Sequence, residues 1–593
     1  MRYTENAYEN NIMNGDAIVD WKETYQTWTA QTDLEAHLKA ELTALAGKDE
    51  ELEDAFYQPM SFGTAGMRGV MGPGINRMNI YTVRQATEGL ATYMDTLGED
   101  VKKRGVAISF DSRHHSTEFA HEAARVLGQH GIKTYIFEGL RPTPELSFTV
   151  RHLHTFAGIM ITASHNPKQF NGYKIYGEDG AQMPPKDSDL ITQYIRQVTD
   201  LFEIATADET NLMTTGLETV IGEDVDQAYL DNVATVTINH DLASEEGKDM
   251  TFVFTPLHGT GRMPGERALR NAGFQNFITV PSQAEPDGDF PTVDFPNPEF
   301  PEAFDEAIKL GKAHQADILI ATDPDADRLG TAVRQPNGDY QLLTGNQIAA
   351  LMLHYILAAN QQAGTLPSNG VAVKSIVSTE FATKIAASYN IDTINVLTGF
   401  KFIAEQIQHF EDTGDHTFMF GFEESYGYLI KPFVRDKDAI QALTLLAEIA
   451  AYYRQQGQTL YDGLEALYAE YGYFREQTLQ QTFEGITGPQ KIEAIINKFR
   501  TQAPKHFAGI DVAATDDIAS GIKTYADGHT EALALPKAEV LKYWLVDGTW
   551  IAVRPSGTEP KIKFYIGTNG ATLSAANQKL QNFVDAINAF VAD

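Results

Sequence analysis

The chain has 593 residues, of which 43% are hydrophobic, and it contains no cysteine. At roughly 150 residues per domain, this length predicts about four domains. The lack of cysteine excludes disulfides, thiolate metal sites and thiol nucleophiles. A formal net charge of -34 disfavours nucleic acid and anionic membranes as partners, and no apolar export segment follows the first residues, MRYTENAYENN. We therefore expect a cytoplasmic enzyme with no nucleic-acid and no membrane partner.

Short apolar runs alternate with amphipathic helical segments through much of the chain. An acidic, Leu- and Ala-rich helix is predicted over 33–56 as a surface extension. Apolar residues at helical spacing predict further helices over 117–130 and 301–314. The expected strands span 106–110, 134–137, 157–162, 252–255, 277–280, 317–322, 371–377, 394–397 and 417–421. Strands that alternate with helices indicate βαβ units, and here they predict three similar α/β domains in series.

The pattern changes after about residue 470. A helix at 489–500 precedes β-rich runs at 540–546, 550–553 and 561–566, and a last helix spans 573–591. This order is typical of an α+β domain with an antiparallel sheet. The predicted fold class is therefore three similar mixed-sheet α/β domains plus a C-terminal α+β domain. The predicted boundaries are 1–215, 216–335, 336–465 and 466–593.

The segment 162–174, TASHNPKQFNGYK, directly follows the apolar run 157–161. Ser164 therefore stands where a buried strand ends, and functional loops commonly begin at such ends. Its hydroxyl could act as a nucleophile or carry a phosphate. Serine and asparagine ahead of Pro167 are also ordinary turn and cap residues. This motif alone leaves both interpretations open.

A second motif, DPDADR at 323–328, also follows an apolar strand. Its alternating carboxylates can turn inward together and offer the hard oxygen ligands that suit Mg²⁺. They belong to Asp323, Asp325 and Asp327. An EF-hand is excluded, because Arg328 takes the position of its glycine and Arg334 that of its bidentate glutamate. A plain acidic turn is the alternative, but the mutual repulsion of three carboxylates favours a bound cation.

Two further loops carry groups that suit a sugar phosphate. GFEESYGY at 421–428 offers Glu423 and Ser425 as hydrogen-bonding groups for adjacent sugar hydroxyls. RPSGTEPK at 554–561 joins two predicted strands. Its hydroxyls, backbone N–H groups and flanking cations are suited to a phosphate. Either loop by itself could also be an ordinary turn.

Together with FGTAGMRG at 62–69, these motifs in their order resemble the α-D-phosphohexomutase superfamily from about Ser61 to the C-terminus. The GFEES sequence, the long N-terminal extension and TGFK at 398–401 resemble its phosphoglucomutase and phosphopentomutase branch. The resemblance implies four domains around a central active-site cleft, each supplying one motif. It also implies a persistent phosphate on Ser164 and one Mg²⁺ per chain, held by the three aspartates and the phosphorylated serine.

The reaction implied by this resemblance interconverts α-D-glucose 1-phosphate and glucose 6-phosphate through a glucose 1,6-bisphosphate intermediate, which also acts as activator. The implied catalytic residues are Ser164, His165, Lys174, Arg68 and Lys437. The general base stays open among the two lysines and the histidine. The implied substrate-binding residues are Arg328, Thr398, Gly399, Lys401, Glu423, Ser425, Arg435, Arg554, Ser556, Gly557, Thr558 and Lys561.

Two other segments resemble the family. Asp111 and Arg113 in FDSRHHS are expected to form a buried ion pair that supports the serine loop. His258 and Gly259 in TPLHGTG match a family loop beside the metal site, and a simple tight turn explains them equally well.

Three alternatives to a phosphoglucomutase remain at this stage. A phosphopentomutase would use the same serine, metal and phosphate grip on ribose or deoxyribose 1-phosphate, and another hexose mutase would differ only in its sugar. A non-catalytic sugar-phosphate-binding protein could share the fold. That last reading requires a lost serine or a broken metal loop, and neither is seen. The chain is expected to be a monomer or a homodimer.

Overall fold

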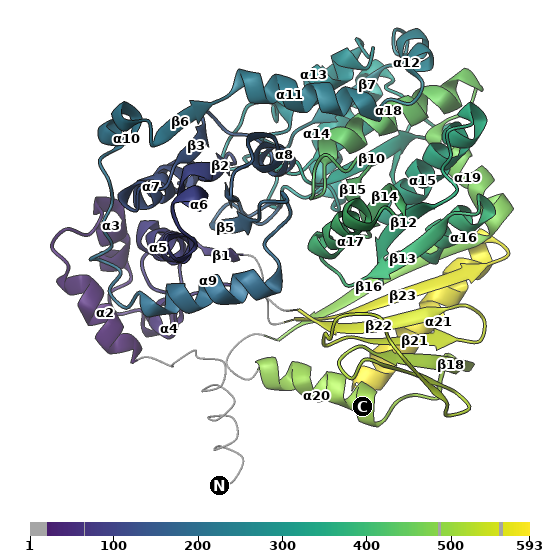
Figure 1. Cartoon of the computed structure of the whole chain (residues 1–593). Helices are drawn as coiled ribbons and strands as arrows, with labels where there is room; N and C mark the ends of the chain where they lie inside the picture. Colours follow the sequence, from purple (N-terminus) through teal and green to yellow (C-terminus); the bar gives the residue numbers. More distant parts are fainter. Residues whose placement is uncertain (1–19, 64–65, 484–487, 557–560, 593) are drawn as a thin grey trace.

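The computed structural model of the chain describes residues 20–63, 66–483, 488–556 and 561–592, which form four sheets in chain order (Figure 1). Among these residues, no helix is both long enough and apolar enough to cross a membrane. The predicted class is confirmed, since three mixed α/β sheets are followed by an antiparallel sheet with two helices.

Helices α2 (Trp21–Ala30), α3 (Ala36–Ala44) and α4 (Asp49–Phe56) open the described chain. The prediction of one continuous helix over 33–56 is wrong, because the chain turns between α3 and α4 at Gly47, whose φ is 84°. A positive φ of this size suits glycine and ends a helix. Trp28, Leu38 and Phe56 are buried in the same apolar core as the first sheet. The extension is therefore part of the first domain and not only a surface addition.

The first sheet has six strands in the order β1-β5-β4-β2-β3-β6. These strands are β1 (Gly66–Val70), β2 (Val106–Phe110), β3 (Thr134–Phe137), β4 (Ala157–Ile161), β5 (Phe170–Tyr176) and β6 (Glu218–Ile221). The helices are α5 (Ile80–Leu97), α6 (Glu99–Arg104), α7 (Ser116–Gln129), α8 (Thr143–Leu153), α9 (Pro185–Gln197) and α10 (Glu209–Thr215). Strands β4, β2, β3 and β6 are parallel, whereas β5 returns antiparallel to β4. The loop between β4 and β5 therefore lies at the carboxyl ends of the parallel strands, where ligands usually bind.

The second sheet has the order β11-β10-β9-β7-β8 and the third β13-β12-β14-β15. The strands are β7 (Phe252–Thr255), β8 (Phe277–Thr279), β9 (Ile318–Thr322), β10 (Leu329–Arg334), β11 (Tyr340–Leu342), β12 (Gly370–Ser375), β13 (Asp392–Val396), β14 (Thr417–Glu423) and β15 (Gly427–Leu429). The α-helices are α11 (Glu223–Val233), α12 (His240–Glu246), α13 (Arg262–Asn271), α14 (Asp305–His314), α15 (Gly345–Ala363), α16 (Glu380–Ser388), α17 (Phe400–Thr413), α18 (Ala439–Gln455) and α19 (Leu460–Tyr471). The helix predicted over 301–314 begins with a 3₁₀ turn, Pro301–Phe304, before α14.

Helix α18 joins the second and third domains. It follows the third sheet in sequence but packs against α12 and α13 of the second domain. A Cβ added to Gly265 of α13 would meet Phe254 of β7 and Leu443 of α18 at about 3 Å, so the two helices approach closely there. One continuous apolar core includes these residues together with Phe420 of β14. The loops that follow β9 and β14 are consequently held in a fixed relation.

The C-terminal sheet has the order β16-β23-β22-β21-β18-β19-β20, with β17 paired to β18. The strands are β16 (Tyr473–Thr482), β17 (His506–Phe507), β18 (Ile510–Asp517), β19 (Ile522–Tyr525), β20 (Thr530–Ala532), β21 (Leu541–Leu545), β22 (Trp550–Pro555) and β23 (Lys561–Gly570), and the helices are α20 (Gly488–Thr501) and α21 (Leu573–Ala592). The pairings between the described strands are antiparallel, as predicted. The segment RPSGTEPK connects β22 to β23.

Candidate active site

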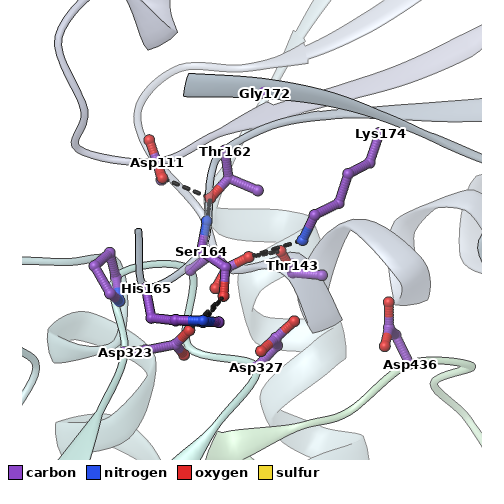
Figure 2. Close-up of polar contacts among 12 residues, drawn as sticks. Asp111, Thr143, Thr162, Ser164, His165, Gly172, Lys174, Asp323, Asp327 and Asp436 are labelled. Atoms are coloured by element: carbon purple, nitrogen blue, oxygen red, sulfur yellow. Dashed lines mark hydrogen bonds and ion pairs between the residues drawn. The ribbon is translucent and has the colours of Figure 1, made fainter. Parts of the chain in front are cut away.

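Ser164 lies three residues beyond the end of β4 and is almost fully buried. Its φ of 50° places a non-glycine residue in the left-handed region, and such strain is commonly retained at functional loops. The Ser164 N–H donates to Thr162 Oγ1 at 2.8 Å, and that hydroxyl donates to Asp111 Oδ2 at 2.6 Å (Figure 2). The side chain of Thr162 thereby fixes the backbone that presents the Ser164 hydroxyl.

Arg113 is the main support of the serine loop. Its Nε lies 3.2 Å from Asp111 Oδ2, and both side chains are fully buried, which confirms the predicted ion pair. The guanidinium donates to the backbone carbonyls of Ser164, Asn166, Pro167 and Phe170. Because five donors are held in one rigid plane, a single side chain fixes the path of the whole loop.

The Ser164 hydroxyl contacts one carboxylate of a buried group of three. Ser164 Oγ donates to Asp323 Oδ2 at 2.7 Å, and ligand oxygens of Asp323, Asp325 and Asp327 lie within 4.8 Å of one another in the buried loop after β9. Oδ1 of Asp325 and Oδ1 of Asp327 have no hydrogen-bond partner among the described residues. Buried oxygens without partners are costly, and hard oxygen ligands match a divalent cation. The residues present therefore fit a metal ion.

The charges around this triad are strongly coupled. Burial and the neighbouring carboxylates raise the pKa of Asp323 well above its usual range. Burial also opposes ionisation of Asp325, but the Lys174 ammonium 3.1 Å away and hydrogen bonds from its neighbours lower the pKa of that carboxyl. Lys437 Nζ lies 3.1 Å from Asp327 and 2.9 Å from Asp436. Lys174 of the first domain and Lys437 of the third domain thus bring positive charge to the triad.

His165 and Arg68 lie beside the serine. His165 Nδ1 is 3.0 Å from Ser164 Oγ. Burial and the charges of Arg328 and Arg68 lower the pKa of His165 well below its usual range, so the ring stays neutral. Arg68 projects from β1 and donates to Asn166 Oδ1 at 3.3 Å. Four of the five predicted catalytic residues therefore lie around the serine loop and its contacts with the triad, namely Ser164, His165, Arg68 and Lys174.

The predicted sugar-binding loop faces the metal loop. Arg328 Nη1 donates to the Ser425 carbonyl at 3.1 Å and also bonds Glu299. Glu423 Oε1 accepts a 2.7 Å hydrogen bond from the Gly399 N–H. Thr398 Oγ1 is buried and has no hydrogen-bond partner within the described chain. Glu423, Gly399 and Thr398 are therefore adjacent, with polar groups available beside the metal loop.

Two predicted substrate-binding residues contact other partners. Arg435 is fully buried, pairs with Glu411 of α17 at 2.5 Å and donates to the Pro432 carbonyl. Burial lowers the pKa of Lys401, and the charges of Glu405 and Asp189 oppose that shift. The pair of Arg435 and Glu411 fastens α17 and does not include the carboxylate triad.

The predicted phosphate loop is described only in part. Arg554 is the penultimate residue of β22, and the Ser556 N–H donates to the Lys561 carbonyl at 2.8 Å. Gly557 and Thr558 lie outside the described residues. Lys563, which sequence reasoning missed, pairs with Arg554 across the hairpin. Burial lowers the pKa of Lys563, and the Glu424 and Glu299 carboxylates oppose that shift. Two lysines at alternate positions of β23, opposite an arginine, are a period-2 pattern that could have revealed it.

Other functional neighbours also escaped sequence reasoning. Thr143 Oγ1 donates to Asp325 Oδ2 at 2.9 Å from the first turn of α8. Tyr176 donates to Asp436 Oδ2 at 2.8 Å, which orients the carboxylate that pairs with Lys437. A single threonine on a helix gives no motif that could have identified it. Asp436 stands beside Lys437 in RDKD, so the charged run was the available indication. His258 lies in a turn, and its ring bonds Thr292, which is distant in sequence. The neighbouring Gly259 packs against Pro324 of the metal loop.

Comparison with known proteins agrees with this arrangement. Residues 59–201, 227–338 and 344–471 match α/β/α domains I, II and III of phosphoglucomutase/phosphomannomutase, and residues 500–582 match its C-terminal domain. The chain belongs to this phosphoglucomutase/phosphomannomutase family, within the α-D-phosphohexomutase superfamily. The resemblance inferred from the motifs is confirmed.

Similar proteins include phosphoglucomutases of Staphylococcus. That of Staphylococcus epidermidis is 40% identical over 536 residues, covering 90% of this chain and 95% of its own length. That of Staphylococcus aureus is 39% identical over 537 residues, covering 90% and 94%. The open form of parafusin, a phosphoglucomutase from Paramecium, has a TM-score of 0.65 at 18% identity, covering 90% of this chain and 95% of its own. A family protein from Burkholderia thailandensis has a TM-score of 0.64 at 20% identity, covering 89% and 97%. At these identities the two structures show the shared fold alone.

Proposed function

We propose that this chain is a phosphoglucomutase that interconverts α-D-glucose 1-phosphate and glucose 6-phosphate through a phosphorylated Ser164. The observation that carries the proposal is the place of the serine hydroxyl, 2.7 Å from Asp323 Oδ2 in a buried carboxylate triad. A hydroxyl at that point can carry a phosphoryl group whose charge is balanced by a cation. The phosphoglucomutases of Staphylococcus, similar over 90% of the chain, support glucose phosphates as substrates.

The reaction begins when a free hydroxyl of the bound hexose monophosphate attacks the phosphorus on Ser164. The bond from phosphorus to Ser164 Oγ breaks as the bond to the sugar oxygen forms, and the hydroxyl proton passes to a base. The resulting glucose 1,6-bisphosphate reverses its orientation within the site and returns its other phosphate to Ser164. The transition state of phosphoryl transfer is loose, so fixed positive charge is the main contribution of the protein. We assign that role to Arg68 and Arg328.

The three aspartates and Ser164 are the residues that would hold Mg²⁺. When bound, this ion supplies positive charge next to the phosphoryl oxygens. Thr143 and Lys174 bond one oxygen of Asp325, so its other oxygen, which has no partner within the described residues, is the one left for a metal. Second-shell bonds of this kind orient ligands and tune metal affinity.

We assign the proton transfer to Lys174. Its Nζ pairs with Asp325 at 3.1 Å, and its side chain keeps 19% of its surface exposed. Burial would lower the pKa of Lys437, but the carboxylates of Asp327, Asp436 and Glu423 raise it, so Lys437 stays a fixed cation. His165 is neutral, and its Nδ1 at 3.0 Å orients the serine hydroxyl. The proposal thus separates a lysine that exchanges a proton from one that holds its charge.

Substrate contacts are proposed for the two remaining loops. Glu423 and Ser425, with Thr398 and Gly399, would hold the sugar hydroxyls. Arg554, Ser556 and Lys561, with Lys563, would hold the phosphate that does not react. Gly557 and Thr558 complete the same motif and are included on the resemblance alone. Arg435 is left to support α17, because it pairs with Glu411, and Lys401 is left out of the substrate contacts, because the charges that act on it are those of Glu405 and Asp189.

A coupled assay tests the reaction. Purified chain with Mg²⁺ and a trace of glucose 1,6-bisphosphate is given glucose 1-phosphate, ribose 1-phosphate or mannose 1-phosphate in parallel. Conversion of glucose 1-phosphate with the highest kcat/KM is expected. A higher value for ribose 1-phosphate would replace the proposal with a phosphopentomutase, a higher value for mannose 1-phosphate would indicate another hexose mutase, and no conversion would refute a mutase altogether.

Intact-mass measurement tests the phosphate carrier independently. Incubation with glucose 1,6-bisphosphate is expected to add one phosphate to the wild-type chain and none to Ser164→Ala. Ser188→Ala is the matched control, since Ser188 is also a buried serine of the first domain and its hydroxyl donates only to the Gly63 carbonyl among the described residues. Phosphate retained by Ser164→Ala would place the carrier elsewhere.

A further inference from the structure

A second group of potential metal ligands lies on the first domain. It consists of His121 on α7, Glu209 at the start of α10 and Glu218 at the start of β6. In Figure 1, α10 and β6 lie at the outer edge of the first domain, whereas the carboxylate triad follows β9 in the second domain. None of the three residues belongs to a motif of the proposed reaction, so the group needs its own explanation.

The three side chains converge on one point. One ligand atom from each, an imidazole nitrogen and two carboxylate oxygens, lies within 4.8 Å of the others. His121 Nδ1 approaches Glu209 Oε1 to 3.2 Å. The side chains of His121 and Glu209 are 34% and 50% exposed, so an ion can reach the group from solvent. The arrangement is open on one side and closed on the other.

The carboxylate of Glu218 is the strongest indication that this group binds an ion. The residue is only 5% exposed, and neither of its carboxylate oxygens has a hydrogen-bond partner among the residues that the structure describes. Its carboxylate is directed at His121 and Glu209. A buried carboxylate without hydrogen bonds is unfavourable, and it is normally paired or coordinated to a metal.

An ion pair alone does not account for these contacts. His121 Nδ1 is buried and lacks a partner of hydrogen-bond geometry within the described chain, in spite of its distance to Glu209. One imidazole also cannot satisfy both oxygens of Glu218, and the two carboxylates repel each other at this separation. A divalent cation in the centre would remove both costs at once.

The geometry points to a divalent transition-metal site, of which Zn²⁺ is the representative ion, held by His121, Glu209 and Glu218. The imidazole favours Zn²⁺ over Mg²⁺, because Mg²⁺ prefers oxygen ligands alone. Three protein ligands leave one tetrahedral position for water. No reaction is assigned to the site, since among the described residues its three members have no hydrogen bond or ion pair with those placed in phosphoryl transfer.

The expected consequence is structural. Helix α10 and strand β6 lie between residues 201 and 227, where the match to the first family domain ends and the match to the second begins. A metal on these three residues would fasten this connecting segment to α7. Leu212 of α10 already packs against Gly128 of α7, so the ion would reinforce an existing contact.

Zinc stoichiometry tests the inference directly. Metal-free wild-type chain and the variants His121→Ala and Glu209→Gln are titrated with Zn²⁺, and bound metal is counted after dialysis. Because the aspartate triad can also take Zn²⁺, the readout is the difference between chains. His121→Ala is expected to bind one Zn²⁺ fewer than the wild type. Glu209→Gln, a change at an exposed residue, is expected to weaken that same site at least tenfold.

The matched control is His314→Ala, which removes an exposed histidine from the end of α14. It should bind as much Zn²⁺ as the wild type. Zn²⁺ should raise the Tm of the wild type and of His314→Ala by more than that of His121→Ala, while Mg²⁺-dependent mutase activity stays the same in all three. Equal zinc binding by the wild type and both site variants would overturn the inference, and the coupled assay would be unaffected by that result.

Discussion

Thr143 Oγ1 donates a 2.9 Å hydrogen bond to Asp325 Oδ2, although 182 residues separate them in sequence. The Thr143 N–H also donates to the Asp325 carbonyl at 2.9 Å. One residue at the start of α8 in the first domain thus fixes both the backbone and the carboxylate of a proposed metal ligand in the second domain. The orientation of Asp325 is decided by contacts between domains.

Thr143→Val is predicted to weaken Mg²⁺ activation. The substitution keeps the shape of the side chain and removes the hydrogen bond to Asp325, and loss of such a bond typically costs about 10- to 100-fold in metal affinity. The measurement is the Mg²⁺ concentration for half-maximal activity. Thr149→Val is the control on the same helix, because Thr149 Oγ1 bonds only the Glu145 carbonyl within the described chain. Equal effects of the two variants would contradict the assignment.

Arg113→Lys is predicted to lower kcat by about 10- to 100-fold, because a lysine cannot hold four loop carbonyls and Asp111 at once. Displacement of Ser164 by about 1 Å is enough for a loss of this size. The measurement is kcat beside Tm. Arg141→Lys is the control, since Arg141, an arginine of the same domain as Arg113, forms a buried pair with Asp226 of α11 and has no contact with the serine loop among the described residues. A similar Tm loss with retained kcat is expected for it, and parallel losses of kcat would count against a positioning role for Arg113.

The two lysines at the triad are predicted to respond differently to arginine. Arginine keeps its proton, so Lys174→Arg should lose about 10²- to 10⁴-fold in kcat if Lys174 exchanges a proton. Lys437→Arg preserves a fixed cation between Asp327 and Asp436 and should lose much less. Single-turnover rates of phosphoryl transfer from the phosphorylated chain give the comparison. A larger loss for Lys437→Arg would reverse the assignment of the base.

Lys542→Met is predicted to change how stability depends on pH. Lys542 is 2% exposed and donates to the Ile376 carbonyl at 2.6 Å, linking the fourth domain to the third. Burial and the Lys374 ammonium lower its pKa to about 7. The unfolded chain, with the ordinary pKa of about 10.4, therefore binds more protons between these values, so folded-state stability rises with pH in that range.

Relative to Lys542→Met, the wild type should gain about 2 to 3 kcal/mol between pH 7 and pH 9, at about 1.4 kcal/mol per pH unit. The difference should level off below pH 7. Denaturant unfolding of the two chains at a series of pH values measures it. Lys523→Met is the control, since Lys523 lies over the same Trp544 ring as Lys542 but is more exposed. A pH-independent difference for Lys542→Met would show that the lysine does not titrate in the folded chain.

Most of the strands and helices that the sequence predicted lie within a few residues of elements in the structure, because hydrophobic periodicity is a local property that folding preserves. The prediction of one helix over 33–56 was wrong at Gly47. The apolar spacing continues there, but the chain makes a turn that requires a positive φ. The buried pair of Asp111 and Arg113 was predicted from a motif, and its four bonds to the serine loop were not. Each of those bonds is to a backbone carbonyl, which carries no residue-specific pattern.

The sequence by itself determined the class of fold and the four motifs, which supply a serine, three carboxylates, a loop with two glutamates and a loop flanked by Arg554 and Lys561. These features are local, since each motif follows its own strand. Only the tertiary structure decided that Ser164 meets Asp323 and that Thr143 orients Asp325. It also paired Lys174 with Asp325, Lys437 with Asp327 and Asp436, and Arg435 with Glu411. Distances between loops depend on how whole domains pack, and pKa values depend on burial and nearby charge, so neither can be read from one stretch of chain.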